Sequence, residues 1–306
     1  MEIDSLTKFW PLIYSIIRKF WTITEPHIED AAVRNDIPVE LYYYSELGLD
    51  TFSTEVFQKR DPFSNPEQFE RLYARLNIKG WIEPLQDRSY RVTDETRQAA
   101  RQIIQAGDTQ LSGLELMSGL HLERLATLLK RIVTEIKAAP EPPEKWAIMK
   151  RFRVADEDSP LPVQIREDLM DLFAYRDDSH LSAARSHFNQ AGIVWSVLGA
   201  LWTGEALTAK QMAERMAFRG YDVDDYEVAI RAAVGVGWAE KAEIPGTFRP
   251  TQMGKDLREQ AEQLTDAYFY RPWLAFTQEE LDELYSLLTG LRDQLKVYGK
   301  STWLGS

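Results

Sequence analysis

The sequence contains no cysteine in its 306 residues. This absence excludes disulfide bonds and thiolate zinc sites, and it suits a reducing compartment. No apolar run approaches the roughly 18 residues that a membrane-spanning helix needs. The first residues also lack the basic start and apolar stretch of a signal peptide. Together these absences predict a cytoplasmic protein.

An excess of positive charge is absent as well, because the formal net charge is −12. Such a charge argues against nonspecific binding of polyanions. The sequence also lacks a glycine-rich phosphate loop, a nucleophile elbow and an HExxH motif. We therefore expect no enzymatic activity, no cofactor and no metal site. With 44% hydrophobic residues the chain can bury a large core, and its length favours two domains.

What the sequence does contain is a segment that occurs twice. Residues 237–262 read GWAEKAEIPGTFRPTQMGKDLREQAE. We interpret them as a short strand, a Pro245-Gly246 turn, a second strand and a helix that begins after Thr251. In such a turn proline fixes φ and glycine accepts a positive φ. A threonine hydroxyl is well suited to accept a backbone N–H at the start of a helix.

Residues 80–101 repeat this order as GWIEPLQDRSYRVTDETRQAAR. Trp81 and Thr93 are 12 positions apart, whereas Trp238 and Thr251 are 13 apart, so the two hairpins differ by one residue. Repetition in this detail indicates an internal duplication. The matched groups are Gly80-Trp81 with Gly237-Trp238, and Arg91-Val92-Thr93 with Arg249-Pro250-Thr251.

A β-hairpin that leaves one helix and enters another is typical of the wing of a winged helix-turn-helix. The sequence therefore predicts a mainly α protein with two such modules joined by long helices, each with a small hairpin wing. Ala106-Gly107-Asp108 predicts a break after the first module, and the prolines at 140–143 predict a linker. The predicted segments are an N-terminal module at 1–105, a helical connector at 106–190, a second module at 191–275 and a C-terminal helix at 276–306.

The first recognition helix is predicted at residues 66–79, after an Asn65 N-cap and with Pro66 at its first position. Arginine and glutamine can bond base edges with two hydrogen bonds, so its outer flank is suited to reading DNA. The alternative is a solvated helix face with a Glu67–Arg71 pair. The predicted DNA-binding residues are Gln68, Arg71, Arg75 and Lys79 on the helix, and Arg88 and Arg91 on the wing.

The corresponding helix of the second module, at residues 224–234, has a different outer face. Asp224, Asp225 and Glu227 lie there with only one cation, Arg231. Phosphate would repel such a face, so we expect a structural or pairing role for this helix rather than DNA binding.

A further set of short motifs lies between residues 175 and 291. They are Arg176-Asp177-Asp178-Ser179-His180-Leu181, Ala191-Gly192-Ile193, Gly237-Trp238, Thr251-x-x-Gly254-Lys255-x-Leu257-Arg258, Glu262-x-x-Thr265-Asp266 and Pro272-Trp273. By these motifs residues 175–291 resemble the SalK-like family of bacterial winged helix-turn-helix proteins, and the first part of the chain has the general pattern of MarR-type regulators. The resemblance implies a transcriptional regulator and carries no catalytic residue. It also favours a ligand pocket that contains His180 and Asp266, with Asp177 beside them.

Two functions remain open from the sequence. The first is a DNA-binding transcriptional regulator that contacts double-stranded DNA through its first module, responds to a small-molecule effector and pairs as a homodimer. The second is a winged-helix module that binds a protein or a small molecule and no longer binds DNA. A continuous exposed patch formed by Arg71, Arg75, Arg88 and Arg91 would favour the first.

Overall fold

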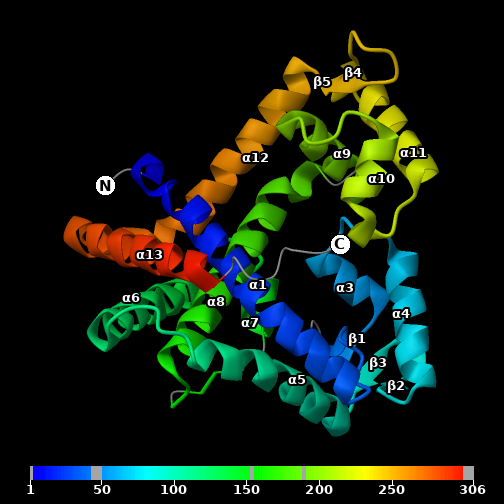
Figure 1. Ribbon diagram of the computed structural model, residues 1–306. Helices are drawn as coiled ribbons and strands as arrows, with labels where there is room; N and C mark the ends of the chain where they lie inside the picture. Colours follow the sequence, from blue (N-terminus) through cyan, green and yellow to red (C-terminus); the bar gives the residue numbers. More distant parts are fainter. Residues whose placement is uncertain (1–2, 43–49, 152–154, 157, 188–190, 299–306) are drawn as a thin grey trace. The chain divides into compact units, whose positions relative to one another are not determined.

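The computed structural model describes residues 3–42, 50–151, 155–156, 158–187 and 191–298. These residues form mainly helices, with two small antiparallel sheets (Figure 1). They fall into two compact units. The first unit combines Met1–Asp50, Val92–Ser179 and Asp266–Ser306, and the second combines Thr51–Arg91 and His180–Thr265. The units group segments differently from the four predicted segments, because residues 1–105 are divided between both units. Helices α8 (Leu161–Ala184) and α12 (Gln252–Tyr270) also contribute to both.

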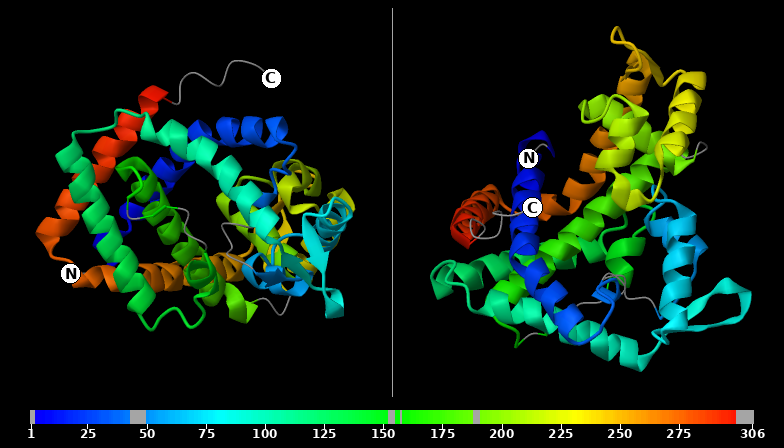
Figure 2. Two further views of the ribbon diagram at one scale, coloured as in Figure 1. Left: turned by 90° about the horizontal axis from the view of Figure 1, so that it is seen from below. Right: turned by 45° about the vertical axis from the view of Figure 1, so that its right-hand side comes forward.

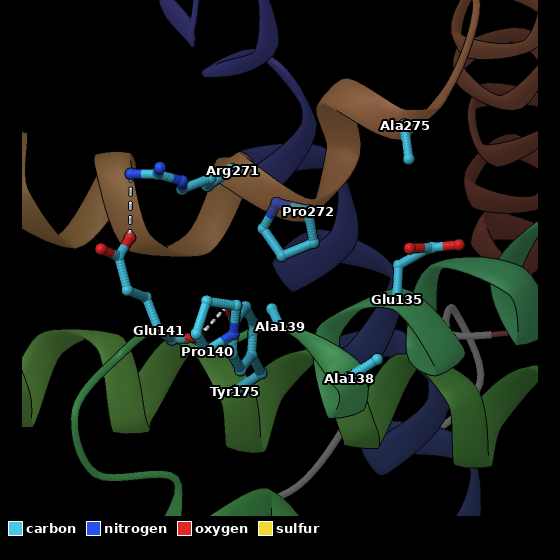
Figure 3. Close-up of a pocket in the computed structure, with 9 residues that line it drawn as sticks. All are labelled: Glu135, Ala138, Ala139, Pro140, Glu141, Tyr175, Arg271, Pro272 and Ala275. Carbon is cyan, nitrogen blue, oxygen red and sulfur yellow. Dashed lines mark hydrogen bonds and ion pairs between the residues drawn. The ribbon is translucent and has the colours of Figure 1, made fainter.

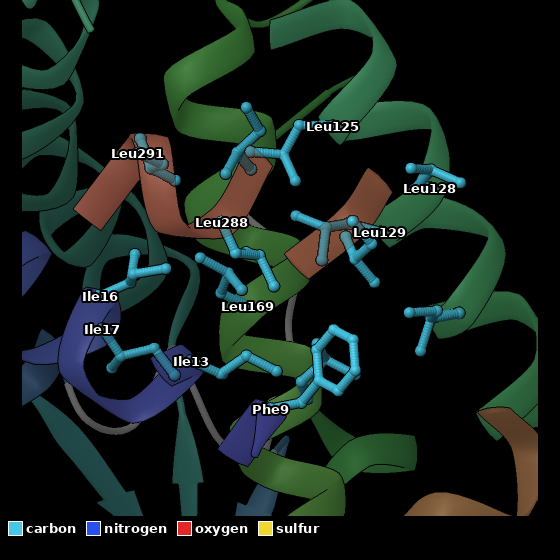
Figure 4. Close-up of a cluster of buried hydrophobic side chains, with 14 of the residues drawn as sticks. Phe9, Ile13, Ile16, Ile17, Leu125, Leu128, Leu129, Leu169, Leu288 and Leu291 are labelled. Carbon is cyan, nitrogen blue, oxygen red and sulfur yellow. The ribbon is translucent and has the colours of Figure 1, made fainter. Parts of the chain in front are cut away.

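The first unit is helical and is held together by one apolar core. Helix α1 packs against α5 and α13, and α6 packs against α13. Figure 4 shows side chains of this core, including Phe9 and Ile13 of α1, Leu129 of α6, Leu169 of α8 and Leu288 of α13, all fully buried. The unit contains η1 (Ile3–Leu6), α1 (Phe9–Arg34), α5 (Asp94–Ser112), α6 (Gly119–Ala138), α7 (Trp146–Lys150), the first part of α8 (Leu161–Ala184), the end of α12 (Gln252–Tyr270), η5 (Arg271–Ala275) and α13 (Gln278–Tyr298).

The predicted break at Ala106-Gly107-Asp108 is wrong, because α5 continues through it to Ser112. The physical reason is the close packing of α5 on α1. A Cβ at Gly107 would lie only 3.1 Å from Ile28 Cδ1 and 3.2 Å from Thr24 Cβ. This glycine therefore serves close helix contact rather than a turn.

The second unit contains both helix–hairpin segments. In the first segment, the short strand β1 pairs antiparallel with β3, giving the sheet order β1-β3-β2, and in the second β4 pairs antiparallel with β5. Besides the end of α8 and the first part of α12, the elements are β1 (Thr51–Phe52), α3 (Thr54–Arg60), α4 (Pro66–Ile78), β2 (Ile82–Pro84), η2 (Gln86–Arg88), β3 (Tyr90–Val92), η3 (Arg185–His187), α9 (Gly192–Thr203), α10 (Ala209–Arg215), η4 (Ala217–Arg219), α11 (Val223–Gly235), β4 (Ala239–Lys241) and β5 (Phe248–Pro250).

Helices α4 and α11 end in the same way. Each has 13 residues. The Trp81 amide donates to Leu76 O at 2.9 Å, and the Trp238 amide donates to Ala233 O at 2.9 Å. The glycine before each tryptophan has a φ of 77° or 78°, in the left-handed region that turns the chain out of the helix.

The helices that follow the two hairpins also begin as the sequence predicts. The Thr93 hydroxyl accepts from the Thr96 amide at 3.2 Å, and the Thr251 hydroxyl accepts from the Gly254 amide at 3.1 Å. These two N-caps are confirmed.

Candidate nucleic-acid interface

Helix α4 presents one face to the interior and one to solvent. Asn65 begins it, since its side-chain oxygen accepts from the Glu67 amide at 3.0 Å. Phe69, Tyr73 and Leu76 then recur at helical spacing and are buried. This pattern leaves the opposite face of α4 exposed for other contacts.

Three of the predicted DNA-binding cations lie in a row on the exposed side of α4. Arg71, Arg75 and Lys79 are four residues apart, so they stand one turn above another. Arg71 Nη1 lies 3.3 Å from Glu67 Oε2, and more than half of each side chain is exposed. An ion pair as exposed as this one stabilises little and can exchange for a phosphate contact.

The hairpin after α4 adds two exposed cations. Arg88 lies at its tip with a φ of 58°, next to Asp87 with a φ of 64°. Arg91 forms a side-chain hydrogen bond and ion pair with Glu83 across the hairpin. That contact raises the pKa of Arg91 above its ordinary value, so the guanidinium stays charged.

Gln68 is placed differently from the other five predicted residues. Its Nε2 donates to Phe218 O at 3.1 Å, in the segment between α10 and α11. The predicted residues therefore divide into an exposed group of five cations on α4 and the hairpin, and one glutamine engaged with the second helix–hairpin segment.

Helix α11 has the same inward pattern as α4 and a different outward one. Trp81 and Trp238 are 157 positions apart. We therefore compare residues of α4 with the residues of α11 that lie 157 positions later. By this spacing Arg71, Arg75 and Lys79 have Val228, Ala232 and Val236 as counterparts.

The charged residues of α11 are mostly acidic, as the sequence predicts. Asp222 and Asp225 form a capping box at its start, which uses the Asp225 carboxylate locally. Asp224 and Glu227 are exposed, and the one cation, Arg231, has its Nη1 3.5 Å from Glu227 Oε2. The exposed surface of α11 is therefore acidic and apolar.

The three residues of the predicted ligand pocket are divided between the two units. Asp266 accepts from Arg176 Nη1 at 2.5 Å within the first unit, which also contains Asp177. His180 belongs to the second unit, where its Nδ1 lies 3.7 Å from Glu262 Oε1. Neighbouring Asp178 is buried and caps α7, since its carboxylate accepts from the first two amides after Trp146 at 2.7 and 2.9 Å.

A buried group of charged side chains in the first unit has no counterpart in the predictions. Arg166 Nη2 lies 2.5 Å from Asp108 Oδ1 and 3.0 Å from Glu167 Oε1. Arg151 pairs with Glu167 and lies 2.6 Å from Asp171 Oδ1. Burial, with a smaller contribution from Glu167, raises the pKa of Asp108 to about 6 despite the opposing effect of Arg166. Sequence patterns place charged residues on surfaces, so they give no signal for such a group.

A cavity of about 300 Å³ lies in the first unit (Figure 3). Its walls are mostly apolar, with Pro140 facing Pro272. At one end Arg271 Nη1 lies 3.1 Å from Glu141 Oε2, while Glu135 lies toward the other end. Among the described residues, no group of three or more histidine and acidic side chains is arranged to hold a metal ion.

The family model for a helix-turn-helix family matches residues 174–299, a region that includes α9 to α11 and the second hairpin. The chain therefore contains a helix-turn-helix domain. Comparisons with curated proteins and with solved structures gave no match. Within the described part of the chain, no helix has the length and apolar character that crossing a membrane requires.

Proposed function

We propose that this chain is an internally duplicated protein with two winged helix-turn-helix modules, and that the first module binds double-stranded DNA in gene regulation. The observation that carries the proposal is the row of Arg71, Arg75 and Lys79 on the exposed side of α4. A helix-turn-helix recognition helix enters the major groove, where such cations contact bases and phosphates.

The comparison with α11 supports this assignment. The three positions of the row carry valine, alanine and valine in α11, although the inward-facing residues of both helices are buried alike. A row of cations that packing does not require is better explained by a ligand that carries negative charge. The resemblance to SalK-like and MarR-type proteins points to the same function.

The DNA contact uses the later part of α4 and its hairpin. Asn65 and Gln68, at the start of the helix, are bonded to residues 218–220 instead. Arg88 and Arg91 on the hairpin are exposed and suited to phosphate contacts. Because Glu67 and Glu83 compete for two of the cations, we expect moderate affinity that falls steeply with salt.

Binding to random-sequence duplex DNA across a salt series tests the proposal. The variant Arg71→Val/Arg75→Ala/Lys79→Val gives α4 the residues of α11. We expect its log–log salt slope to fall by about 3, roughly one unit for each lost phosphate contact, and its affinity at low salt to fall at least about tenfold.

The matched control removes three cations from the second module, Arg231→Ala/Lys241→Ala/Arg249→Ala. Since it changes the net charge equally, it separates a local contact from a general charge effect, and we expect wild-type binding. Equal losses in the two variants would contradict the assignment to α4.

A second candidate function, binding of a protein partner, is favoured by the surface of the second module. Val228 on α11 and Ile244 on the hairpin are 57% and 67% exposed, and each directly follows an exposed glutamate, Glu227 and Glu243. Apolar side chains within an acidic surface suit a basic partner. An absence of wild-type DNA binding even at low salt would favour this function over the first.

A further inference from the structure

The two helix–hairpin segments are joined inside the second unit by specific contacts. The Asn65 amide donates to Arg219 O at 2.8 Å, and Asn65 Nδ2 donates to Gly220 O at 3.1 Å. Gln68 Nε2 donates to Phe218 O at 3.1 Å. We call this contact between the start of α4 and residues 218–220 the junction. In Figure 1 and in the right-hand view of Figure 2, the start of α4 meets the loop that leads into α11.

Glycines allow the junction to close. Gly220 has a φ of 72°, and a Cβ there would lie 1.9 Å from Gln68 Oε1 and 3.0 Å from Gln68 Cβ. A Cβ at Gly192, the first residue of α9, would lie 2.0 Å from Pro62 O. At Gly192 the close atoms belong to the backbone, so a larger residue would force the chain apart. At Gly220 the close atoms belong to the Gln68 side chain, which a smaller residue at position 68 would remove, while the positive φ favours glycine. The guanidinium of Arg219 also lies 5.1 Å from the centre of the Phe63 ring.

The junction brings the starts of the two recognition helices close together. Asn65 is the N-cap of α4, and Gly220 lies two residues before Asp222, the N-cap of α11. The junction therefore ties the start of α4 to the chain that enters α11, and it leaves the later turns of α4 and the first hairpin exposed. The exposed charged residues of α11 are mostly acidic, so phosphate would repel that helix.

We infer that the protein binds DNA with the junction closed, so that α4 alone enters one major groove and α11 makes no DNA contact. This inference rests on the proposed function and specifies its partner as a single, asymmetric site about one helical turn long. One molecule then occupies one site, and no palindrome is required.

A disulfide across the junction tests the inference directly. Because the chain has no cysteine, the variant Gln68→Cys/Gly220→Cys contains only the designed pair. The Cβ separation of 3.0 Å is shorter than the roughly 3.5–4.5 Å of a disulfide, and Gly220 has a positive φ, so the bond requires a small backbone shift at the junction. We expect the pair to oxidise in the folded protein, and the oxidised form to bind a random-sequence duplex of about 30 base pairs within about twofold of the reduced form.

The reduced form of the same variant is the control. Its binding distinguishes failure of the inference from failure of the proposed function. Binding by the reduced form with loss of at least tenfold on oxidation would overturn the inference and leave the proposed function standing. A pair that stays reduced in folded protein reflects the short Cβ separation as much as an open junction, and the duplex-length comparison below then decides. If neither the reduced variant nor the wild type binds DNA, the proposed function fails and the inference fails with it.

A second measurement uses the wild-type protein and does not depend on how the cysteine variant folds. It compares random-sequence duplexes of about 12 and 30 base pairs at low salt. We expect one molecule per 12-base-pair duplex, with affinity within about threefold of that per site on the longer duplex. Binding confined to the longer duplex, with two recognition helices or two molecules required, would overturn the inference.

Discussion

The segment from α4 through its hairpin and the segment from α11 through its hairpin share a scaffold and differ in surface. Both helices have 13 residues, both hairpins follow a glycine in the left-handed region, and both lead to a threonine N-cap. At the positions of the α4 row of cations, α11 carries Val228, which is exposed, and Ala232 and Val236, which are partly buried against the core of the second unit. The comparison shows that caps and buried residues determine this fold, while the exposed residues are free to determine a partner.

The two segments differ at one buried position after the threonine N-cap. An exchange there gives the largest expected change in unfolding free energy. Gly254 is the third residue after the Thr251 N-cap, and Thr96 holds this place after Thr93. A Cβ at Gly254 would lie 2.1 Å from Trp238 O, which is a backbone atom and cannot move aside easily. We expect Gly254→Thr to cost about 4 kcal/mol of unfolding free energy, measured by urea denaturation.

The reverse exchange, Thr96→Gly, is the control for this prediction. It removes a buried methyl group and introduces a glycine into a helix, so it should cost about 1 kcal/mol. If the two exchanges cost the same, the contact with Trp238 O does not determine which residue fits.

Replacing either of two aspartates at equivalent positions, Asp108 and Asp266, is expected to change the unfolding free energy in opposite directions. Asp108 and Asp266 each lie 15 residues after their threonine N-cap, and each pairs with an arginine of α8. Asp108 is buried with a pKa of about 6, whereas the Asp266 side chain is 27% exposed. At pH 7.5 we expect Asp108→Asn to raise the unfolding free energy by about 2 kcal/mol, and Asp266→Asn to lower it by about 1 kcal/mol.

The sign of the Asp108 effect follows from its raised pKa. The folded state binds this proton more tightly than the unfolded state, so the contribution of Asp108 to stability falls as the pH rises from about 4 to about 6. The gain from Asp108→Asn should therefore disappear at pH 4, where both side chains are neutral. A loss of stability at pH 7.5 would show that the ion pair with Arg166 outweighs the cost of burial.

The parts of the fold that the sequence predicted are those with local causes. Asn65, Thr93 and Thr251 begin helices where the sequence places them, because a cap depends on residues three or fewer positions away. The capping box of Thr277 and Glu280 at the start of α13 is local as well. The DNA-binding and ligand-pocket residues stay predictions.

What the sequence did not predict depends on contacts between distant segments. Gly107 reads as a turn residue until α1 is packed against α5. Gln68 reads as a base-contacting residue until residues 218–220, about 150 positions later, are placed beside it. Arg166 and Asp108, 58 positions apart, give no local signal of their pairing. No rule of spacing connects such positions.

The smallest expected change in stability comes from removing one arginine from either hairpin. These two substitutions should differ only in their effect on DNA binding. Arg91 pairs with Glu83 across the first hairpin, and Arg249 Nε lies 2.9 Å from Glu240 Oε1 across the second. All four side chains are about half exposed. Exposed pairs stabilise little, so Arg91→Ala and Arg249→Ala should both unfold at the wild-type urea concentration. Only Arg91→Ala should reduce the salt slope of DNA binding, by about 1. An equal reduction for Arg249→Ala would place both hairpins on DNA and end the functional distinction between the two segments.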